Sequence, residues 1–327
     1  MSVFVSGSTG YIGKQLVMRL SELGEGVHAL YRSEEKRKTI DFAGIQQFKG
    51  DILDQSSLLV AMKGCSEAYH VAAFAGVVFD PSTIYRLNVE GTLNVIAAAK
   101  QAGVKRVVVT STAGILGPSN SGIPVNESSP DPDSFFTPYE LSKFQMEQKI
   151  KELDLSGIEV VIVNPTRVYG PGLLSESNGV TLMIKKYLKN KWRFLPGNGT
   201  QSGNYVFVED VVKGHILAME RGKPGERYIL GGANLSYIQL FDLVREVSQT
   251  FKKLYRIPFW SMMAASYAMQ GIAPLTGRPP LIVPDLVRKF NHHWVVSSEK
   301  AAREIGYAPV SAREGIDLTV QWINNNF

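Results

Sequence analysis

The fold of this chain is decided by the stretch Val3-Phe4-Val5-Ser6-Gly7-Ser8-Thr9-Gly10-Tyr11-Ile12-Gly13. An apolar, strand-like run leads into three glycines, and a helix-like segment at 11–23 follows them. The first glycine permits a tight turn, the next lets the backbone approach a pyrophosphate, and the third lets helix and strand pack closely. A helix that begins here directs free N–H groups and a partial positive charge at the phosphates. The loop therefore favours a dinucleotide site over a purely structural turn.

Short apolar runs alternate with helix-like segments through the first half of the chain. The pattern predicts strands at 3–5, 27–30, 45–48, 68–72, 106–110 and 160–163, and helices at 11–23, 82–102 and 139–155. This alternation is typical of a parallel sheet with helices on both faces. The β-branched runs at 107–109 and 160–163 fit strands that are buried on both sides. The predicted fold class is α/β, a Rossmann-type doubly wound parallel sheet.

The character of the sequence changes after Gly170-Pro171-Gly172. Turn signals multiply at 196–199, and apolar helices interrupted by prolines follow. This pattern predicts a smaller, mostly helical substrate lobe. The runs at 205–208 and 228–230 are expected to return to the large sheet. The dinucleotide-binding domain is therefore predicted at 1–170 plus about 205–235, and the substrate lobe at about 171–204 plus 236–327.

Composition bounds the function classes. Of 327 residues, 44% are hydrophobic and 20% charged, which is ordinary for a globular protein. The net charge of +5 is not concentrated in runs apart from 34–38, so it does not indicate a nucleic-acid binder and suits an anionic small molecule. The single cysteine, Cys65, excludes a disulfide within the chain and cysteine-based zinc sites, and is expected in the core. His292-His293 lack metal-ligand partners at useful spacing, so no metal is predicted.

No membrane span is expected. Residues 2–6 already form a predicted strand, so no targeting segment is apparent before it. The longest apolar stretch, 259–274, is interrupted by Ser261, Ser266, Gln270 and Gly271, and is too short and too polar to cross a bilayer. A cytoplasmic location is the resulting expectation.

The end of the second predicted strand bears on the choice of cofactor. An acidic residue about 20 positions past the glycines would hold the ribose 2′-OH of NAD. Arg32 stands 19 positions after Gly13, and Tyr31 beside it is not acidic either. An arginine can fork onto a 2′-phosphate, and 36–38 add basic charge. The sequence therefore favours NADP, with NAD as the alternative; a solvated basic loop is the structural explanation for the same residues.

Three side chains form a candidate catalytic set. Tyr139 and Lys143 lie four apart, one helical turn, so both point the same way. A nearby ammonium is expected to lower the pKa of the tyrosine, which suits a general acid or base. Thr112 closes the strand at 106–110, where the topology of such sheets puts ligands, and could align a substrate carbonyl with Tyr139. The alternative is that the Thr112 hydroxyl only caps the end of the strand. Ser111, which precedes it, carries the neighbouring hydroxyl and has to be considered beside it.

Together these motifs resemble the extended short-chain dehydrogenase/reductases, the NAD-dependent epimerase/dehydratase superfamily. Segments 205–210, 225–232, 276–280 and 297–301 are similar to its dihydroflavonol-reductase-like branch, which includes proteins named hopanoid-associated sugar epimerases. The resemblance implies hydride transfer between nicotinamide and a carbonyl carbon, with Tyr139 as proton donor, Lys143 on the nicotinamide ribose and Thr112 orienting the carbonyl. The cofactor contacts that it implies are Gly7, Thr9, Gly10, Tyr11, Ile12, Gly13, Arg32, Asp51, Ile52, Ala72, Ala73, Tyr139, Lys143, Asn164, Pro165 and Val168.

Two departures from the family pattern narrow the activity. Sugar 4,6-dehydratases carry Thr-Asp-Glu where this chain has Thr112-Ala113-Gly114, so water elimination is not expected. Many nucleotide-sugar enzymes carry Arg-Asp where Gly203-Asn204 stand here, which removes a bidentate contact to the diphosphate; Arg278 or Lys185 could substitute. We therefore expect an NADP-dependent oxidoreductase acting on a carbonyl or alcohol of a small, fairly apolar substrate. A nucleotide-sugar epimerase with tightly bound NAD(P) and a non-catalytic NADP-sensing regulator are the alternatives.

Several apolar side chains in the second lobe have two interpretations. Their helical spacing is more typical of residues in a hydrophobic core. The functional alternative is a hydrophobic substrate pocket, with Phe74, Val77 and Phe79 on its opposite wall. Asp51 could equally serve a turn or helix cap, and His215 is expected to be structural. A homodimer through the helices at 82–102 and 139–155 is what the family resemblance suggests. The apolar lobe residues in question are Trp260, Met262, Met263, Tyr267, Met269 and Ile272.

Overall fold

The computed structural model describes residues 2–75, 81–119, 123–276, 280 and 282–327. Its centre is a seven-stranded sheet in the order β10-β6-β5-β4-β1-β2-β3, and every neighbouring pair is parallel. The strand order runs outward in both directions from β1, so the glycine loop after β1 lies at the middle of the sheet. The strands are β1 Ser2–Ser6, β2 Gly26–Tyr31, β3 Ile45–Lys49, β4 Cys65–His70, β5 Arg106–Thr110, β6 Glu159–Pro165 and β10 Arg227–Leu230.

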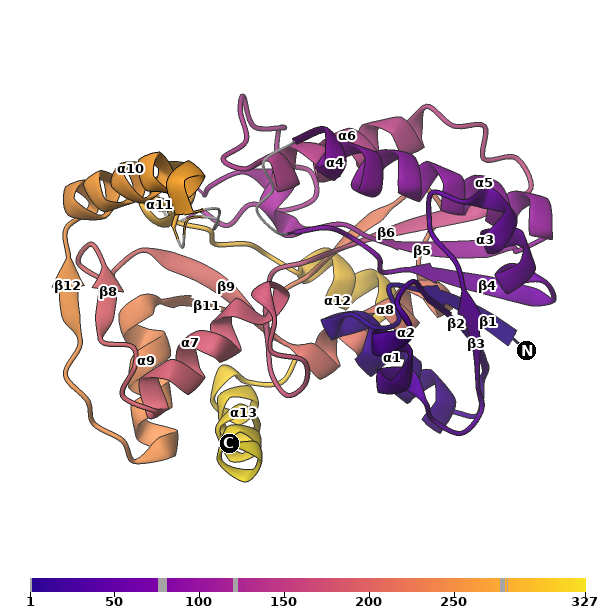
Figure 1. Cartoon of the computed structure of the whole chain (residues 1–327). Coiled ribbons are helices and arrows are strands. Elements are labelled where there is room, and N and C mark those ends of the chain that lie inside the picture. The colour runs from indigo at the N-terminus through magenta and orange to yellow at the C-terminus, as the bar shows by residue number, and fades with distance from the viewer. Residues whose placement is uncertain (1, 76–80, 120–122, 277–279, 281) are drawn as a thin grey trace.

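Helices cover both faces of this sheet, as the doubly wound prediction requires (Figure 1). One layer holds α3 (Gln55–Met62), α5 (Gly91–Ala102) and α6 (Pro138–Lys151), with the short α4 (Pro81–Tyr85) beside α6. The other layer holds α1 (Tyr11–Glu22), α8 (Val208–Arg221) and α12 (Glu299–Ile305). The short elements α2 (Glu34–Arg37) and Lys38–Ile40 follow β2. The predicted α/β Rossmann-type class is confirmed.

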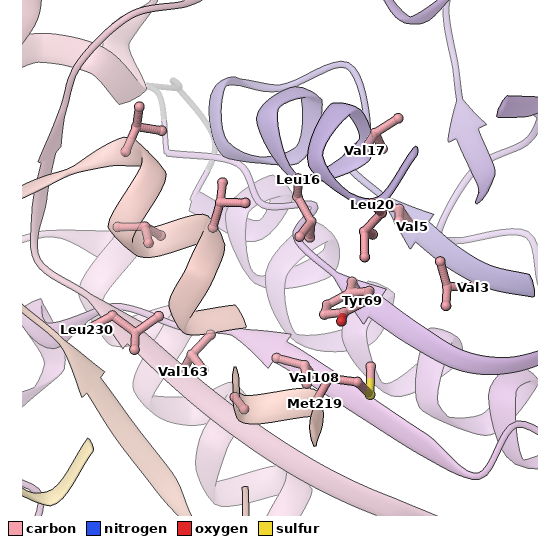
Figure 2. Close-up of a cluster of buried hydrophobic side chains, with 14 of the residues drawn as sticks. Val3, Val5, Leu16, Val17, Leu20, Tyr69, Val108, Val163, Met219 and Leu230 are labelled. Atoms are coloured by element: carbon pink, nitrogen blue, oxygen red, sulfur yellow. The ribbon is translucent and has the colours of Figure 1, made fainter. Parts of the chain in front are cut away.

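The two faces of the sheet pack into two separate cores. Figure 2 shows the first, in which Val3 of β1, Leu16 of α1, Tyr69 of β4, Val108 of β5 and Met219 of α8 converge. Residues 107 and 109 of β5 point the opposite way, into the second core beneath α3, α5 and α6. Both directions are buried because helices cover both faces, which confirms the interpretation of the β-branched runs.

The second lobe combines helices with two small sheets. One has the order β11-β9-β7 and the other pairs β12 with β8. The helices around them lie at the far side of the molecule from the N-terminus (Figure 1). The elements are β7 Arg167–Tyr169, α7 Gly179–Leu188, β8 Phe194–Pro196, β9 Ser202–Phe207, β11 Ala233–Ser236, α9 Tyr237–Ser248, β12 Tyr255–Ile257, α10 Phe259–Thr276, α11 Pro284–Phe290 and α13 Ala312–Asn326.

Two expectations about these elements are wrong. The run at 205–208 does not return to the large sheet, because β7 leaves the end of β6 and offers its edge to β9 instead. The run at 228–230 does return, as β10 beside β6. The predicted helix at 82–102 is interrupted by a π-helical turn at Arg86–Glu90 that buries Asn88. Such one-turn bulges accommodate an extra residue and often lie at functional sites.

Most of the apolar residues of α10 are not core, although Ala273 is buried. Trp260 is 75% exposed, Tyr267 51% and Met269 37%. The core interpretation fails because α10 packs mainly against the short α11 and leaves most of its circumference uncovered. No described helix is long and apolar enough to cross a membrane. The division of the chain into two domains stays a prediction, and α12, beyond residue 236, packs on α8 and β10 of the large sheet.

Candidate active site

The glycine loop has the geometry that its sequence predicts. Gly7 takes φ +70°, and a Cβ there would lie 2.5 Å from the backbone nitrogen of Ala72. A Cβ on Gly13 would lie 2.1 Å from the carbonyl oxygen of Gly7. Only glycine fits either position, because the turn after β1, the start of α1 and the end of β4 meet there with no room for side chains.

The first turn of α1 is left without a side-chain cap. Gly10 is the N-cap residue and has no side chain to accept from the helix, while its own N–H donates to the Gly7 carbonyl at 2.9 Å. Helical N–H groups that are not capped from within the chain suit a phosphate. Thr9 and Ile12 lie half-buried at this turn, whereas Tyr11 is buried and donates to the Gly170 carbonyl at 3.1 Å. This cradle fits the pyrophosphate of a dinucleotide.

Arg32 lies at the end of β2, beside the loop after β3. Its Nη1 is 4.0 Å from Asp51 Oδ2, and its side chain is 72% exposed. A pair that long and that exposed holds the guanidinium weakly. In the basic segment beyond, Arg37 contacts Glu34 and Gln47, which is a structural use of that charge. Arg32 is therefore a weakly held cation at the ribose end of the predicted site, and its side chain can turn toward a ligand.

Four further residues predicted to bind the cofactor fall on adjacent loops. Asp51 accepts from the Leu53 N–H at 3.0 Å, so the turn role that we considered for it is present. Ile52 packs against α5, where a Cβ on Gly91 would lie 2.7 Å from its Cδ1. Ala72 borders Gly7, and Ala73 follows it at the carboxyl end of β4. All four therefore lie at the same edge of the sheet as the glycine loop.

Thr112 begins a short 3₁₀ helix (Ala113–Leu116) directly after β5. Its Oγ1 accepts from the Gly114 N–H at 3.2 Å, so the capping role is real. The same hydroxyl lies beside the first turn of α6, because a Cβ on Gly114 would be 3.4 Å from Thr112 Oγ1 and 3.1 Å from Glu140 Oε1. Neighbouring Ser111 is buried with its Oγ unpaired among the described residues. The structure thus brings Thr112 to the turn of α6 that carries Tyr139.

Lys143 is a fully buried cation. Its Nζ donates to the Thr110 carbonyl at 2.8 Å and contacts Met146 Sδ at 3.7 Å; it forms no ion pair within the described residues. Burial lowers the pKa of its ammonium to about 8, and nearby Glu147 partly opposes this change. Burying an ammonium without a carboxylate partner lowers the stability of the fold. Buried charges of this kind are typical of functional sites.

The expected lowering of the Tyr139 pKa is wrong for this structure. Burial, and secondarily the charge of Glu140, raises the pKa of the phenol to about 12. Lys143 does not offset this, because its ammonium is turned to the Thr110 carbonyl rather than held on the phenol. Tyr139 therefore carries its proton at neutral pH, as an unperturbed tyrosine with a pKa near 10 also does.

Asn164 and Pro165 end β6 next to Thr112. Asn164 Nδ2 donates to the Thr112 carbonyl at 3.2 Å and to Glu147 Oε1 at 2.7 Å, while its Oδ1 is buried and unpaired among the described residues. Glu147 is itself held by Arg227 at 3.5 Å. Val168, in contrast, packs into the first core and is 9% exposed. An orphaned amide oxygen at the edge of the site suits a ligand donor.

Sequence reasoning missed two residues that shape the site. Glu140 is buried, accepts from the Phe136 and Thr137 N–H groups, and pairs with Lys289 of α11, so the second lobe is tied to the turn of Tyr139. Thr137-Pro138-Tyr139-Glu140 is a capping-box pattern that could have revealed it. Asn88 of the π turn donates to Ser142 Oγ at 2.9 Å, and no sequence signal marks that bulge.

Arg167 carries a second cation that lacks a carboxylate partner among the described residues. Its Nη1 donates to Tyr205 Oη at 3.2 Å and to Tyr237 Oη at 3.3 Å, and the guanidinium lies over both rings. The absence of a side chain at Gly203 makes room for it, because a Cβ there would lie 2.5 Å from Nη1.

His215 and Cys65 are buried in positions that indicate a structural role. His215 is buried between Thr110 Oγ1 at 2.8 Å and the Val211 carbonyl at 2.7 Å, and burial lowers its pKa to about 4. Cys65 is buried, and burial raises its thiol pKa to about 11, so it is not a reactive thiolate. The Phe74 backbone N–H donates to Asn88 Oδ1 at 2.8 Å, whereas Val77 and Phe79 lie outside the described residues.

Comparison with known proteins assigns the chain to a family. The pattern of the NAD dependent epimerase/dehydratase family matches residues 3–231. The chain belongs to this family. A ketoreductase of Stigmatella aurantiaca that acts on 4-hydroxy-2-methyl-3-oxo-4-farnesyl-3,4-dihydroquinoline-1-oxide is 30% identical, over 98% of this chain and 96% of its own. A protein of Synechocystis sp., provisionally named dihydroflavonol 4-reductase, is also 30% identical, over 99% of this chain and 94% of its own.

Solved structures agree with the family assignment. The crystal structure of gox2253 has a TM-score of 0.84 at 30% identity, covering 99% of this chain and 98% of its own. UDP-glucose 4-epimerase of Thermotoga maritima has a TM-score of 0.81 at 23% identity, covering 99% of each chain, and shows the common fold. As a member of the epimerase/dehydratase family, this chain is an NAD(P)-dependent reductase or dehydrogenase of the extended short-chain type.

Proposed function

We propose that this chain is an NADP-dependent reductase of a small, fairly apolar carbonyl compound, working at Thr112, Tyr139 and Lys143. The observation that carries the proposal is the arrangement of these three residues. Thr112 follows β5 beside the first turn of α6, which carries Tyr139, and the buried ammonium of Lys143 lies one turn further along that helix. When bound, the nicotinamide supplies or accepts the hydride. Tyr139 then donates its proton to the carbonyl oxygen, and Thr112 orients that oxygen.

The choice of NADP rests on Arg32. Its guanidinium stands at the end of β2, where an acidic residue would hold a free 2′-OH, and its pairing with Asp51 is long. A guanidinium can contact a 2′-phosphate through two parallel hydrogen bonds. Apolar substrates are supported by the relatives, whose names refer to sterols and to a farnesylated quinoline oxide.

The test follows the absorbance of reduced nicotinamide with NADPH or NADH and two substrate panels, apolar ketones or aldehydes and nucleotide-sugars. We expect turnover of an apolar carbonyl with NADPH. Tyr139→Phe should lower kcat by about 10²- to 10⁴-fold while NADPH binding, followed by fluorescence, stays unchanged. Undiminished turnover in Tyr139→Phe would falsify the assignment of the proton donor. Intact NADPH binding with no turnover of either panel would favour the sensing regulator instead.

A second measurement isolates the cofactor preference. Arg32→Gln should raise KM for NADPH about tenfold or more, because a charge-assisted contact to the 2′-phosphate is lost, and leave KM for NADH nearly unchanged. Arg37→Gln is the matched control, since that side chain is already used by Glu34 and Gln47. Equal effects of Arg32→Gln on both cofactors would mean that Arg32 does not read the phosphate.

One observation favours the second candidate, a nucleotide-sugar epimerase. Gly203 lacks the arginine of the nucleotide-sugar enzymes, yet the guanidinium of Arg167 lies over that glycine and pairs with no carboxylate in the described part of the chain. A cation is thus available at this place from the neighbouring strand. Interconversion of a nucleotide-sugar without net loss of NADPH, abolished by Arg167→Gln, would select the epimerase.

A further inference from the structure

The outer end of the second lobe exposes an unusual group of side chains. On α10, Trp260 is 75% exposed, Tyr267 51% and Met269 37%; on the adjoining ribbon, Phe194 of β8 is 49% exposed and Tyr255 of β12 51%. We call these five residues the α10 patch. The 18 residues of α10 include no Asp, Glu, Lys or Arg. Figure 1 shows α10 and the β8–β12 ribbon together at one extremity of the molecule.

The patch is fixed in place rather than loosely attached. Phe259, at the start of α10, packs on the turn after β8, where a Cβ on Gly197 would lie 2.3 Å from its ring. Ser266 and Ala273 form the buried side of the helix. The exposed aromatic rings therefore cannot turn inward, because the opposite side of α10 already makes the contacts with the lobe.

The surroundings of the patch are basic. Residues 247–284, which include β12 and α10, contain Lys252, Lys253, Arg256 and Arg278 and no acidic residue, and Arg193 directly precedes β8. Lys253 Nζ lies 5.3 Å from the centre of the Tyr255 ring, and Arg288 donates to Tyr267 Oη at 3.0 Å. Asp285, which pairs with Arg288, is the first acid after this stretch.

We infer that the α10 patch docks on the surface of an anionic lipid bilayer. An uncharged helix with exposed Trp, Tyr and Met, framed by lysines and arginines, has the composition of interfacial helices that lie in the headgroup region. Tyr and Trp are the residues that favour this interface, and cations nearby attract anionic lipid. A second copy of the chain is the poorer occupant, since it would bring an equally basic face against this one.

Docking here would place the active site near the lipid. α11, on which α10 packs, joins the first turn of α6 through Lys289 and Glu140, the residue next to Tyr139. An apolar substrate dissolved in the bilayer would thus meet the protein on the same side as the catalytic turn. The docking itself does not depend on the proposed reductase activity, because it concerns a surface that lacks the catalytic residues.

The experiment is co-sedimentation of the full chain, without substrate or cofactor, with vesicles of phosphatidylcholine alone or mixed with phosphatidylglycerol. We expect binding to the mixed vesicles and weak binding to phosphatidylcholine. The double variant Trp260→Ser/Tyr267→Ser should lower the partition coefficient about tenfold or more. Lys253→Gln/Arg256→Gln should remove much of the preference for phosphatidylglycerol.

Val60→Ser is the matched control, because Val60 is 64% exposed on α3, far along the chain from the patch, and should leave binding unchanged. Circular dichroism verifies that each variant is folded. Failure of the wild type to bind mixed vesicles overturns the proposal, as does equal binding by folded Trp260→Ser/Tyr267→Ser. Sedimentation velocity covers the competing occupant: a dimer that this double variant dissociates, with no vesicle binding, assigns the face to a second copy.

Discussion

Helices α6 and α10 invert the usual relation between polarity and burial. α6 buries Glu140, Ser142, Lys143 and Glu147, four polar or charged side chains of its 14 residues. α10 has no charged residue, yet exposes Trp260, Tyr267 and Met269. Burying a charge and exposing an apolar surface both cost stability. This chain is therefore less stable than it could be in two places, the catalytic turn and the outer face of its second lobe.

The largest effect is expected where the two regions are joined. Lys289→Met should lower the free energy of unfolding by about 3 kcal/mol, because Glu140 would be left as a buried carboxylate without its cation. Urea unfolding followed by circular dichroism measures this change. Glu140→Gln/Lys289→Met is the control, since it removes both charges and should recover part of the loss. A loss below about 0.5 kcal/mol would show that α11 is not anchored to α6 by this pair.

The sequence predicted α6 and α10 with unequal success, and the reason is physical. Helical spacing is local, so the start of α6 and the placing of Tyr139 and Lys143 one turn apart on it could be inferred. The predicted end at 155 is wrong, because α6 ends at Lys151, and the ammonium of Lys143 turns to the Thr110 carbonyl. The exposure of α10 could not, because the spacing of its apolar residues is the same for core and for surface. Burial depends on what packs against a helix, and α11 is too short to cover it.

Other predictions divide in the same way. The glycine loop was predictable because its pattern of strand, glycines and helix is local, although the backbone that crowds Gly7 is at Ala72, distant in sequence. The path of β9 into the small sheet, the π turn that buries Asn88, and the direction of the Lys143 ammonium depend on segments distant in sequence. The raised pKa of Tyr139 belongs to this second group, since burial outweighs the expected influence of the lysine.

A smaller effect, of opposite sign, is expected inside α6. Lys143→Met should raise the free energy of unfolding at pH 7 by about 1 kcal/mol while abolishing turnover, because a buried ammonium is removed at the cost of its hydrogen bond to Thr110. The folded-state pKa of Lys143 is about 8 and its ordinary value 10.5, so the unfolded chain binds more protons between these values.

This difference in proton binding makes the effect of Lys143→Met on stability depend on pH. The contribution of Lys143 to stability rises as pH increases from about 8 to 10.5, and the advantage of Lys143→Met should shrink over that window. Thermal unfolding of both proteins at several pH values measures the difference. A constant difference from pH 7 to 10 would contradict the lowered pKa.

The smallest effect is expected on α10. Trp260→Ser should change the free energy of unfolding by no more than about 0.5 kcal/mol, since three quarters of the side chain is already in water. Chemical unfolding of the variant beside the wild type decides this. A loss of several kcal/mol would show that Trp260 is covered in solution, and the contrast between the two helices would disappear.

The strand order of the large sheet also dictates a sequence of events during synthesis. β1 emerges first but lies at the centre, and it cannot pair with β4 until residues 65–70 have been made. The cradle around Gly7, which needs the backbone at Ala72, is incomplete before then. The edge strand β10 ends only at Leu230, so the sheet closes after most of the chain has left the ribosome. Pairings such as β1 with β4 and β6 with β10 join segments about 65 residues apart, and non-local contacts of this kind slow folding.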